Sequence, residues 1–563
     1  MAKLNQAQSD LLRYNAAMRP MMRSQFNKSH SHTTTFDSGY IVPIDWDRVI
    51  PGDEKEIKFS GLCRMATPLH PTMDQAILDV WTFYIPDRLW WAHAKNFYGE
   101  NLDASFNPDG LYVMPYLKPS QYCVDQEEGP ERGGLGSLND YFGFPVCSKS
   151  VALTRDSDSA FFMSAGLHRC YQLVYNEYFR NSSIQPAIRF NDGDYVTNEE
   201  WEEIQQIRIA NRFPDLYTTL LREPQAGEDV YLTLGSFAPV ITRGQELPNP
   251  SSVPLFWYDT VEGSSAADNS DGAVGISSGS TVYDEAFTIN KSSHEISPYN
   301  LWADMTQLPG ATINDLRVAI TTQQLLELDA RSGKRYQQLL YAAFGCLTVD
   351  STLSRPQLCG ACRQDIGIRT VVQTSEGTQA SPLGNLAAFS QTNVTNQYIC
   401  NNAFTEPGFI ITLACVRPVV SYSQGLDPLL QRLDRFEHYY PLFDNLGNQP
   451  LYAHNLYFGD NASVNELKNV FGYMEAWSPD RIKQNRVSGL MRPDVDGTLS
   501  SWNYAIHFES TPYLNDNFIK VDPELIDRTI AVPSEPQFIL DCYFDYKDSK
   551  NMSVHSVPGV DKI

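Results

Sequence analysis

One stretch, Asp74 to Trp91, constrains the fold more than any other part of the chain. Its middle, Ile77 to Ile85, is β-branched and aromatic apart from Asp79 and Thr82. Such a composition is typical of a strand that is buried on both faces of a sheet. Pro86 cannot donate to a strand ladder, so we expect the strand to end there. The stretch therefore predicts a central strand of a large β structure.

The rest of the composition favours the same fold class. The chain has 563 residues, of which 12 % are aromatic, with 34 Pro and 34 Gly. Many aromatic and chain-punctuating residues fit an all-β fold with long loops better than a helical one. A second apolar run, Phe409 to Val416, is expected to pair with the opening strand. Further strands are expected at Thr33–Ile50, Lys55–Phe59, Asp229–Val240, Ile368–Gln373, Phe409–Ser421, Ser500–Phe508 and Ala531–Tyr546.

Two regions have the apolar spacing of helices. Residues 160–180 are the first, and Thr312 to Phe344 is the longer one. Thr312 with Asp315 resembles a capping box, and Ser332-Gly333 should divide the region into two helices. We expect the cluster Glu199, Glu200, Glu202 and Glu203 to form a solvated acidic helix face. We expect the polar tail from Lys547 to lie on a surface or against a neighbour.

The net charge, the apolar runs and the cysteine content indicate which partners and which compartment to expect for the chain. The net charge is −24, which on average repels nucleic acid. No apolar run approaches 18 residues, so no membrane insertion is expected, and the N-terminus does not resemble a secretory signal. Ten scattered cysteines in a long chain without a signal indicate free thiols in a reducing compartment.

Residues 1–35 differ in charge from the remainder. They carry five cations against one acid, a local net charge of 5 − 1 = +4. One interpretation is a basic N-terminal arm that contacts phosphate while its aromatic residues stack on bases. A solvated tail, or an arm packed on a neighbouring subunit, explains the same pattern. The candidate nucleic-acid contacts are Lys3, Arg13, Arg19, Arg23 and Lys28.

No motif indicates an enzyme, a cofactor or a metal site. His30 and His32 lack a third ligand, and Cys359-Gly-Ala-Cys362 lacks a second cysteine pair. Gly275-Ile-Ser-Ser-Gly279 matches a nucleophile elbow in letters only, because that motif requires a strand before it and a helix after it. We therefore expect no catalytic residues, no metal and no cofactor.

A long insertion occupies residues 241–310. Within Gly263 to Ser280, 13 of 18 residues are Gly, Ser, Asp or Asn, which cannot bury enough apolar surface to offset their ordering entropy. We expect an exposed excursion, and long irregular loops of this kind are often functional.

Several stretches, in this order and spacing, resemble the major capsid proteins of the Microviridae, the small single-stranded-DNA bacteriophages, and especially the gokushovirus-like branch. They lie along most of the chain: FNKSHSHTTTFDSGYIVPIDWDRVIPGD, LCRMATPLHPTMDQAILDVWTFYIPDRLWW, YQLVYNEYFRNSSIQP, FPDLYTTLLREPQAG, ATINDLRVAITTQQLLELDARSGKRYQQLL, RPQLCG, FTEPGFIITLACVRPVVSYSQGLDPLL, FGYMEAWSPDRIKQNRVSGLMR and ILDCYFDY.

The resemblance implies a mainly β fold, an eight-stranded antiparallel jelly roll of the viral capsid type with long inserted loops and a few helices. It implies an arm at residues 1–35, a jelly-roll domain at 36–563, and a three-fold protrusion at 241–310 involved in host attachment. Implied partners are other copies in pentamers of a T=1 icosahedral shell, a circular single-stranded DNA genome, DNA pilot and scaffolding proteins, and a host surface receptor. The implied location is the virion, assembled in the cytoplasm of the bacterial host.

A different class of function also fits a large aromatic β protein. A jelly-roll carbohydrate-active protein, either a lectin or a glycosidase, could use Trp90, Trp91, Trp201 and Trp257 as a sugar platform. A glycosidase would also need two carboxylates about 5–10 Å apart in a cleft. No spacing in the sequence singles out such a pair, so the resemblance favours a shell-forming protein without catalysis.

Overall fold

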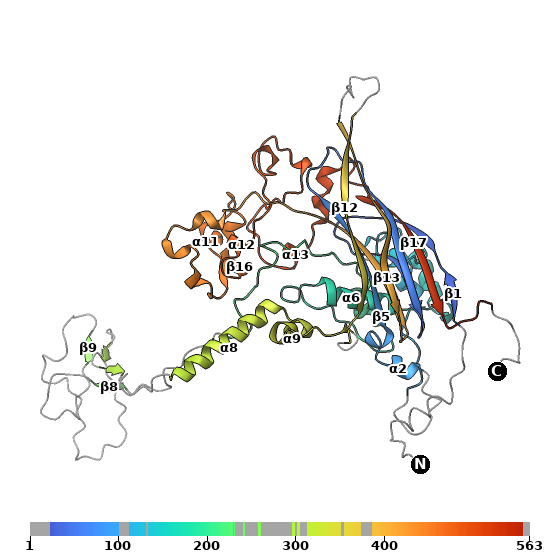
Figure 1. Ribbon diagram of the computed structural model, residues 1–563, viewed down its shortest axis with the longest axis horizontal. Helices are drawn as coiled ribbons and strands as arrows, with labels where there is room; N and C mark the ends of the chain where they lie inside the picture. Colours follow the sequence, from blue (N-terminus) through green and yellow to red (C-terminus); the bar gives the residue numbers. More distant parts are fainter. Residues whose placement is uncertain are drawn as a thin grey trace, which may run out of the picture. The chain divides into compact units, whose positions relative to one another are not determined.

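Long antiparallel strands dominate the computed structural model (Figure 1). It describes residues 23–100, 112–130, 133–228, 230, 240–242, 257–259, 296–298, 301–303, 312–350, 354–372 and 386–555. The chain divides into two compact units. Unit 1 comprises Met1–Pro224 with Asp329–Ile563, and unit 2 is Gln225–Leu328.

Unit 1 contains the main sheet, whose strands run in the order β1-β17-β4-β13-β12-β5-β14-β3, with β2 also paired to β17. The strands are β1 (Ser24–Asn27), β2 (His30–Phe36), β3 (Val42–Val49), β4 (Glu54–Met65), β5 (Ala76–Pro86), β12 (Gln357–Val372), β13 (Leu386–Ala403), β14 (Gly408–Pro418) and β17 (Phe538–Lys550).

The pairing of these strands is nested. β2 pairs with β17, β3 with β14, β4 with β13 and β5 with β12, all antiparallel. In a jelly roll the chain folds back on itself, so that the first strand pairs with the last, the second with the next to last, and so on inward. The expectation of an eight-stranded antiparallel jelly roll is confirmed, and β1 adds a short ninth strand beside the end of β17.

The strand β5 is buried on both faces, as its composition predicts. Leu78, Val80 and Tyr84 point into the core that the two halves of the sheet share. Phe83 and Ile85 point the other way, into a second apolar cluster. β14 pairs with β5 along its whole length and follows the same alternation, which confirms the predicted pairing of the two apolar runs.

Helix α6 (Gly166–Val174), which continues as a π-helical turn (Tyr175–Phe179), contributes to the second cluster together with Trp90 and Trp91. Gly166 permits a close approach, because a Cβ there would lie 2.7 Å from the ring of Phe409. Trp90 and Trp91 are completely buried. Each large apolar side chain buried in this way contributes about 1.5–3 kcal/mol, so this layer stabilises the sheet substantially.

The other half of the sheet is buried on one face only. Along β4 and β17, buried residues alternate with residues that are partly or fully exposed. This pattern is typical of an antiparallel sheet with one face on the core and one toward solvent. Near the ends of β4 and β17, however, charged residues take buried positions, among them Lys55 and Asp548.

The region 312–344 forms two helices, as predicted. They are α8 (Ile313–Ser332) and α9 (Tyr336–Phe344), separated by Gly333 with φ +92°. Thr312 and Asp315 form the expected capping box, with the Asp315 amide donating to Thr312 Oγ1 at 3.1 Å and the Thr312 amide donating to Asp315 Oδ2 at 3.0 Å.

Shorter elements complete unit 1. Its described residues also form two small two-stranded antiparallel sheets. They pair β6 (Tyr116–Leu117) with β7 (Met163–Ser164), and β15 (Gln449–Tyr452) with β16 (Val470–Met474). Its short helices are α2 (Ala94–Phe97), α3 (Pro119–Tyr122), α4 (Leu138–Tyr141), α5 (Lys149–Arg155), α7 (Asn198–Ile204), α11 (Val464–Leu467), α12 (Ser478–Arg481) and α13 (Asp516–Ile519).

Three predictions in unit 1 are wrong in part. Residues 500–508 form no strand, because side chains from other segments accept from their backbone amides: the Tyr504 amide donates to Asp74 Oδ2 at 2.8 Å and the Phe508 amide to Gln424 Oε1 at 2.7 Å. The tail from Lys547 is not a surface tail, since β17 continues to Lys550. In α7, Glu200 is buried and accepts from Arg169 Nε at 2.9 Å, so the acidic face is not wholly solvated.

Unit 2 contains the insertion. Its described strands pair in two antiparallel sets, β8 (Val240–Thr242) with β11 (Leu301–Ala303) and β9 (Trp257–Asp259) with β10 (Ile296–Pro298). Of the expected strand 229–240, only residues 230 and 240 are described. The Gly/Ser/Asp-rich segment 263–280, with the nucleophile-elbow letters, lies outside the described residues.

Candidate functional site

The base of the N-terminal arm is the first candidate site. Of the five predicted DNA contacts, Lys3, Arg13 and Arg19 lie outside the described residues. Arg23 lies on the surface, where its Nη2 donates to the carbonyl oxygen of Gly52 at 2.9 Å and lies 3.6 Å from Glu54 Oε2.

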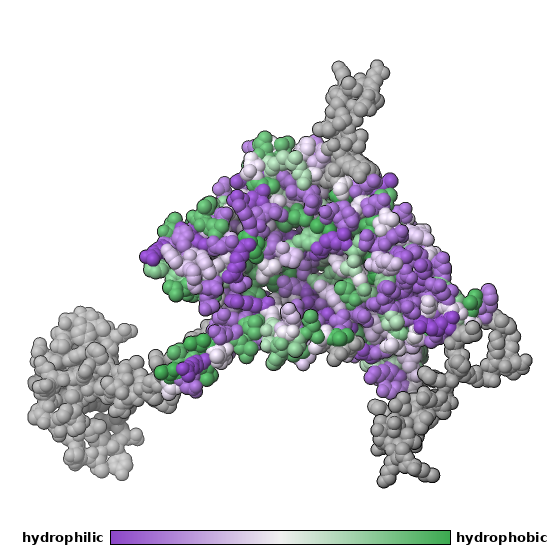
Figure 2. Space-filling model, in the orientation of Figure 1, coloured by the Kyte–Doolittle hydropathy of each residue, from purple (hydrophilic) through white to green (hydrophobic). Residues whose placement is uncertain are grey.

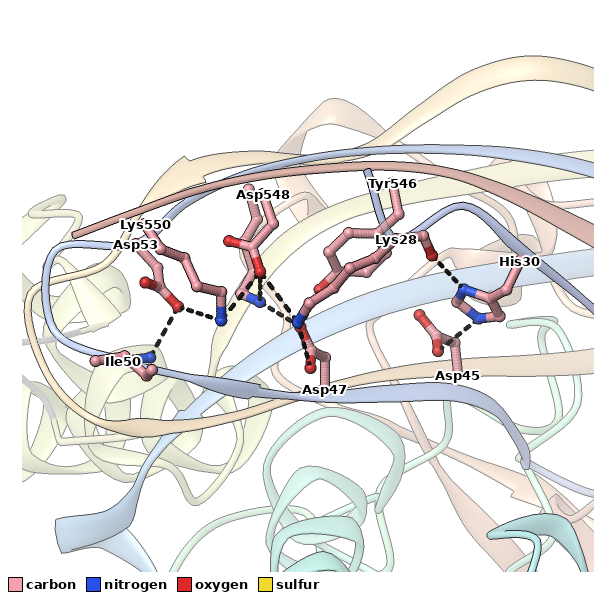
Figure 3. A network of polar contacts seen from close by, with 10 residues as sticks. Lys28, His30, Asp45, Asp47, Ile50, Asp53, Tyr546, Asp548 and Lys550 are labelled. Carbon is pink, nitrogen blue, oxygen red and sulfur yellow. Dashed lines mark hydrogen bonds and ion pairs between the residues drawn. The ribbon is translucent and has the colours of Figure 1, made fainter. Parts of the chain in front are cut away.

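Lys28 belongs to an ionic network, drawn in Figure 3, that joins the start of the arm to β3, β4 and β17. Its Nζ lies 2.9 Å from Asp47 Oδ2 and 3.2 Å from Asp548 Oδ2. The fully buried Lys55 also pairs with both carboxylates, at 3.1 Å from Asp548. Lys550 bridges Asp548 and a third carboxylate, Asp53, at 3.1 Å each.

The network balances charge at the edge of the core: Lys55, Asp53 and Asp548 are buried, whereas Lys28 and Asp47 are partly exposed. Three lysines (Lys28, Lys55, Lys550) face three carboxylates (Asp47, Asp53, Asp548). Although burial opposes ionisation, Lys55 and Lys28 lower the pKa of Asp47 to about 2. Burial likewise opposes the charge of Lys28, but Asp47 and Asp548 raise its pKa above the ordinary value.

His30 is partly exposed and links Lys28 to a further carboxylate, Asp45. Its Nε2 lies 3.1 Å from Asp45 Oδ1, and its Nδ1 lies 2.9 Å from the carbonyl oxygen of Lys28. Two oxygen acceptors suit the protonated ring, in which both nitrogens donate. The hydrogen bond to Asp45 outweighs burial and raises the pKa of His30 to about 9.

These contacts hold the first described residues of the arm against the end of the sheet. The charge of Lys28 is already opposed by two carboxylates, so its contact with phosphate stays a prediction. The arm base is therefore fixed to the sheet at Lys28 and His30.

An exposed apolar surface is the second candidate site. We call residues 428–446 the apolar ridge; it includes the short 3₁₀ turns η7 (Pro428–Gln431), η8 (Arg435–Glu437) and η9 (Pro441–Phe443). Four large side chains on it are mostly exposed: Leu430 (80 %), Leu433 (92 %), Phe436 (68 %) and Leu442 (94 %). Figure 2 shows hydrophobic groups on the surface of the lobe that carries α11, α12 and β16, the part of unit 1 with which the ridge is in contact.

The ridge is held in one conformation by its own polar contacts. The guanidinium of Arg432 donates to both oxygens of Asp480 at 3.1 and 2.7 Å. The Trp477 indole donates to the carbonyl oxygen of Phe443 at 2.9 Å, and Glu437 accepts from the Leu433 amide at 2.7 Å. A surface that exposes many large apolar groups in a fixed geometry is typical of a protein–protein interface.

Sequence reasoning missed this surface. The letters PLLQRLDRFEHYYPLF carry many apolar residues without a strand or helix period, bounded by Pro428 and Pro441. This combination could have predicted an exposed apolar surface, because a segment that forms neither a core helix nor a core strand can expose its apolar residues.

Three of the four candidate tryptophans, those whose side chains the structure describes, are not available for a sugar platform. Trp90, Trp91 and Trp201 are all buried. The side chain of Trp257 lies outside the described residues. His168 is also a core residue: its Nε2 lies 2.8 Å from Asn139 Oδ1, and burial lowers its pKa to about 3.

No helix among the described residues combines the length and the apolarity needed to cross a bilayer. Likewise, within the described parts of the chain, no three His, Cys, Asp or Glu side chains gather as a metal site would require.

Comparison with known proteins gives the family. A family model described as capsid protein (F protein) matches residues 17–560. The capsid protein VP1 of Spiroplasma virus 4 is 32 % identical over 578 residues, covering 100 % of this chain and 99 % of the relative. The capsid proteins VP1 of Chlamydia phage 1 (32 %, 96 % of each chain) and Bdellovibrio phage phiMH2K (30 %, 95 % of each chain) are similar over nearly their whole lengths. The chain therefore belongs to the phage capsid F protein family.

Proposed function

We propose that this protein is the major capsid protein of a small single-stranded-DNA phage, and that its copies assemble through pentamers into a T=1 icosahedral shell. The observation that carries the proposal is the full-length similarity to three phage capsid proteins. The jelly roll supports it, because this fold recurs in viral capsids. The role is structural, without catalysis.

The apolar ridge is the part of the surface best suited to contact a second copy. Leu433 and Leu442 expose nearly their whole side chains although the backbone that carries them is fixed. Burying one such leucine against a neighbour contributes about 1.5–3 kcal/mol. We infer that the ridge is buried between subunits of the shell.

The arm supplies the contact with the genome in this proposal. Lys3, Arg13 and Arg19, with smaller contributions from Arg23 and Lys28, would neutralise phosphates. The ionic network holds Lys28 on the sheet, so we assign the genome contact mainly to the cations that precede it in the sequence.

The remaining partners follow from the same proposal. The insertion at 241–310 would form the three-fold protrusion and contact a host surface receptor. DNA pilot and scaffolding proteins would contact the shell from other faces. The protein would assemble in the cytoplasm of the bacterial host and reside in the virion.

A pair of variants tests the assembly surface. In full-length protein, Leu433→Asp with Leu442→Asp should abolish particles in sedimentation and electron microscopy, because two charges would have to be buried at the interface. The matched control is Leu490→Asp with Leu499→Asp, two exposed leucines outside the ridge. Normal particles from the ridge variant, or equal loss from the control, would contradict the assignment.

A deletion tests the arm. Removing residues 1–22 leaves the ionic network complete, so the subunit should fold while the packaged DNA per particle falls. Charge-neutral replacement of Lys3, Arg13 and Arg19 by Gln should have the same effect. Particles with the normal DNA content would count against the arm as a genome contact.

A further inference from the structure

A cavity of about 620 Å³ lies in unit 1, at the start of the apolar ridge. Its wall comes from Asn455 and from three longer segments, which are Leu216 with Tyr217, residues 422–430 and residues 479–492. We call it the Lys483 pocket. Its volume falls within the range of ordinary small-ligand sites.

The wall of the Lys483 pocket carries four cations, Arg481, Lys483, Arg486 and Arg492, against two carboxylates, Asp427 and Asp480. The whole chain has a net charge of −24, so this local excess of positive charge is opposite in sign to the charge of the chain as a whole. Local charge of one sign in a concave site attracts ligands of the opposite sign.

The two carboxylates are already engaged. Asp480 receives both donors of Arg432, at 3.1 and 2.7 Å. Asp427 Oδ1 accepts from the Leu429 amide at 3.0 Å, and its Oδ2 lies 3.6 Å from Arg486 Nη1.

Two of the cations have no such partner. Arg481 pairs with Glu475 at 2.8 Å. Among the residues that the structure describes, neither Lys483 nor Arg492 has a carboxylate within ion-pair distance. The unbalanced positive charge of the pocket is therefore concentrated on Lys483 and Arg492.

A third polar group in the wall lacks a partner. The side-chain Nε2 of Gln484 is shielded from water and has no hydrogen-bond partner within the described parts of the chain. A buried donor without an acceptor is costly. A ligand oxygen in the pocket would supply that acceptor after a small rotation of the side chain.

The remaining wall is apolar. Pro428, Leu429, Pro479 and Val487 face the same cavity as the cations. A ligand that fits this wall combines an anionic group with a flat, weakly polar body. A nucleotide has both parts, and an unpaired strand can place a base in the cavity without first breaking a base pair.

We propose that the Lys483 pocket binds one nucleotide of single-stranded DNA, with the phosphate on Lys483 and Arg492 and the base against the proline and leucine wall. This inference rests on the proposed function, because the enclosed genome supplies the strand. It adds a second point of contact to the arm, on the folded body of the subunit.

The test compares binding of fluorescein-labelled oligo(dT) by full-length protein at several salt concentrations. The variant is Lys483→Gln with Arg492→Gln, and the control is Lys468→Gln with Arg222→Gln, two exposed cations outside the pocket. Each neutralised phosphate contributes roughly 0.7 to the log–log salt slope for a single strand, and Lys483 and Arg492 share one phosphate, so we expect the slope to fall by about 0.7 in the pocket variant. We also expect affinity to fall at least about tenfold at low salt, with little change in the control.

A second measurement locates the strand directly. An oligonucleotide carrying 4-thiothymidine should crosslink to residues 428–430 or 483–492 in the wild type, and not in the pocket variant. Thymidine monophosphate should compete at lower concentration than inorganic phosphate, because the base adds contacts. Equal competition would show an anion site without a base subsite and would overturn the nucleotide assignment.

Other outcomes separate this proposal from the proposed function. If the wild type forms shells but its salt slope and crosslinks are the same as those of the pocket variant, the pocket proposal fails and the capsid role stands. If the pocket variant loses assembly while its oligonucleotide binding is unchanged, the pocket holds an acidic segment of a neighbouring subunit instead. If the wild type forms no shells, the capsid role fails whatever the oligonucleotides show.

Discussion

Replacing Lys55 by Met tests whether the ionic network holds the two chain ends on the sheet. Lys55 is fully buried, and its Nζ pairs with Asp548 at 3.1 Å and with Asp47. Methionine keeps the unbranched stem and removes the charge. The variant therefore leaves the buried Asp548 and the partly buried Asp47 with fewer partners while changing the packing little.

The magnitude follows from the partners that remain. Breaking a buried ion pair by removing one member costs about 3–5 kcal/mol. Asp548 would keep Lys28 at 3.2 Å and Lys550 at 3.1 Å, so we expect the lower end, about 3 kcal/mol. At 1.36 kcal/mol for each factor of ten, this corresponds to roughly a 150-fold rise in local opening.

Hydrogen exchange of the unassembled subunit measures this effect directly, because local opening sets amide protection. Peptides covering 24–36 and 538–550 should exchange faster in the variant, while peptides of β5 and β14 should not. The control is Lys58→Met on the same strand, since Lys58 lies on the solvent side of β4 and pairs at 3.3 Å with a surface carboxylate. We expect little change there.

A double variant checks the cause. Adding Asp548→Asn to Lys55→Met removes the uncompensated charge and should restore part of the protection. If Lys55→Met exchanges no faster than Lys58→Met, the buried charges do not fix the chain ends and the reasoning is wrong.

Three further predictions concern pH, packing and the insertion. The pKa of Asp47 is held at about 2, so the stability that its charge contributes is present above about pH 3.8 and is lost as the pH falls toward 2. Pepsin should therefore cut within residues 23–36 increasingly as the pH falls over that interval. The variant Asp47→Asn should show a weaker pH dependence of this cleavage. In Gly408→Ala, the new Cβ would lie 2.3 Å from the carbonyl oxygen of Ile85, so we expect a loss of about 1–3 kcal/mol in thermal unfolding, whereas Gly129→Ala has open space and should change little. Replacing 263–280 by a short linker should spare particle yield but alter attachment to host cells in a binding assay, and a collapse of assembly would show that the segment is structural.

Sequence reasoning reached the elements whose signal is local. β5 and β14 are continuous apolar runs, and the capping box of α8 and the glycine break before α9 lie within a few residues of the features they determine. The jelly roll itself came from the resemblance, because the pairing of β2 with β17 joins residues about 500 positions apart.

The remaining features of the fold and of the sites depend on contacts between residues that lie far apart in the sequence, which no local pattern reveals. β13 is rich in Thr, Asn and Gln and lacks strand composition, but it is fixed between β4 and β12 by pairing. Lys55 and Glu200 look like solvated charges until Asp548 and Arg169 are brought to them by the fold. The Lys483 pocket likewise combines three distant segments, so no single motif marks it.

Electron microscopy of the purified full-length protein tests the central claim most directly. The account predicts closed particles of uniform size with icosahedral symmetry, in which the apolar ridge is buried between subunits. A protein that stays monomeric at every concentration, with the ridge in water, would contradict it.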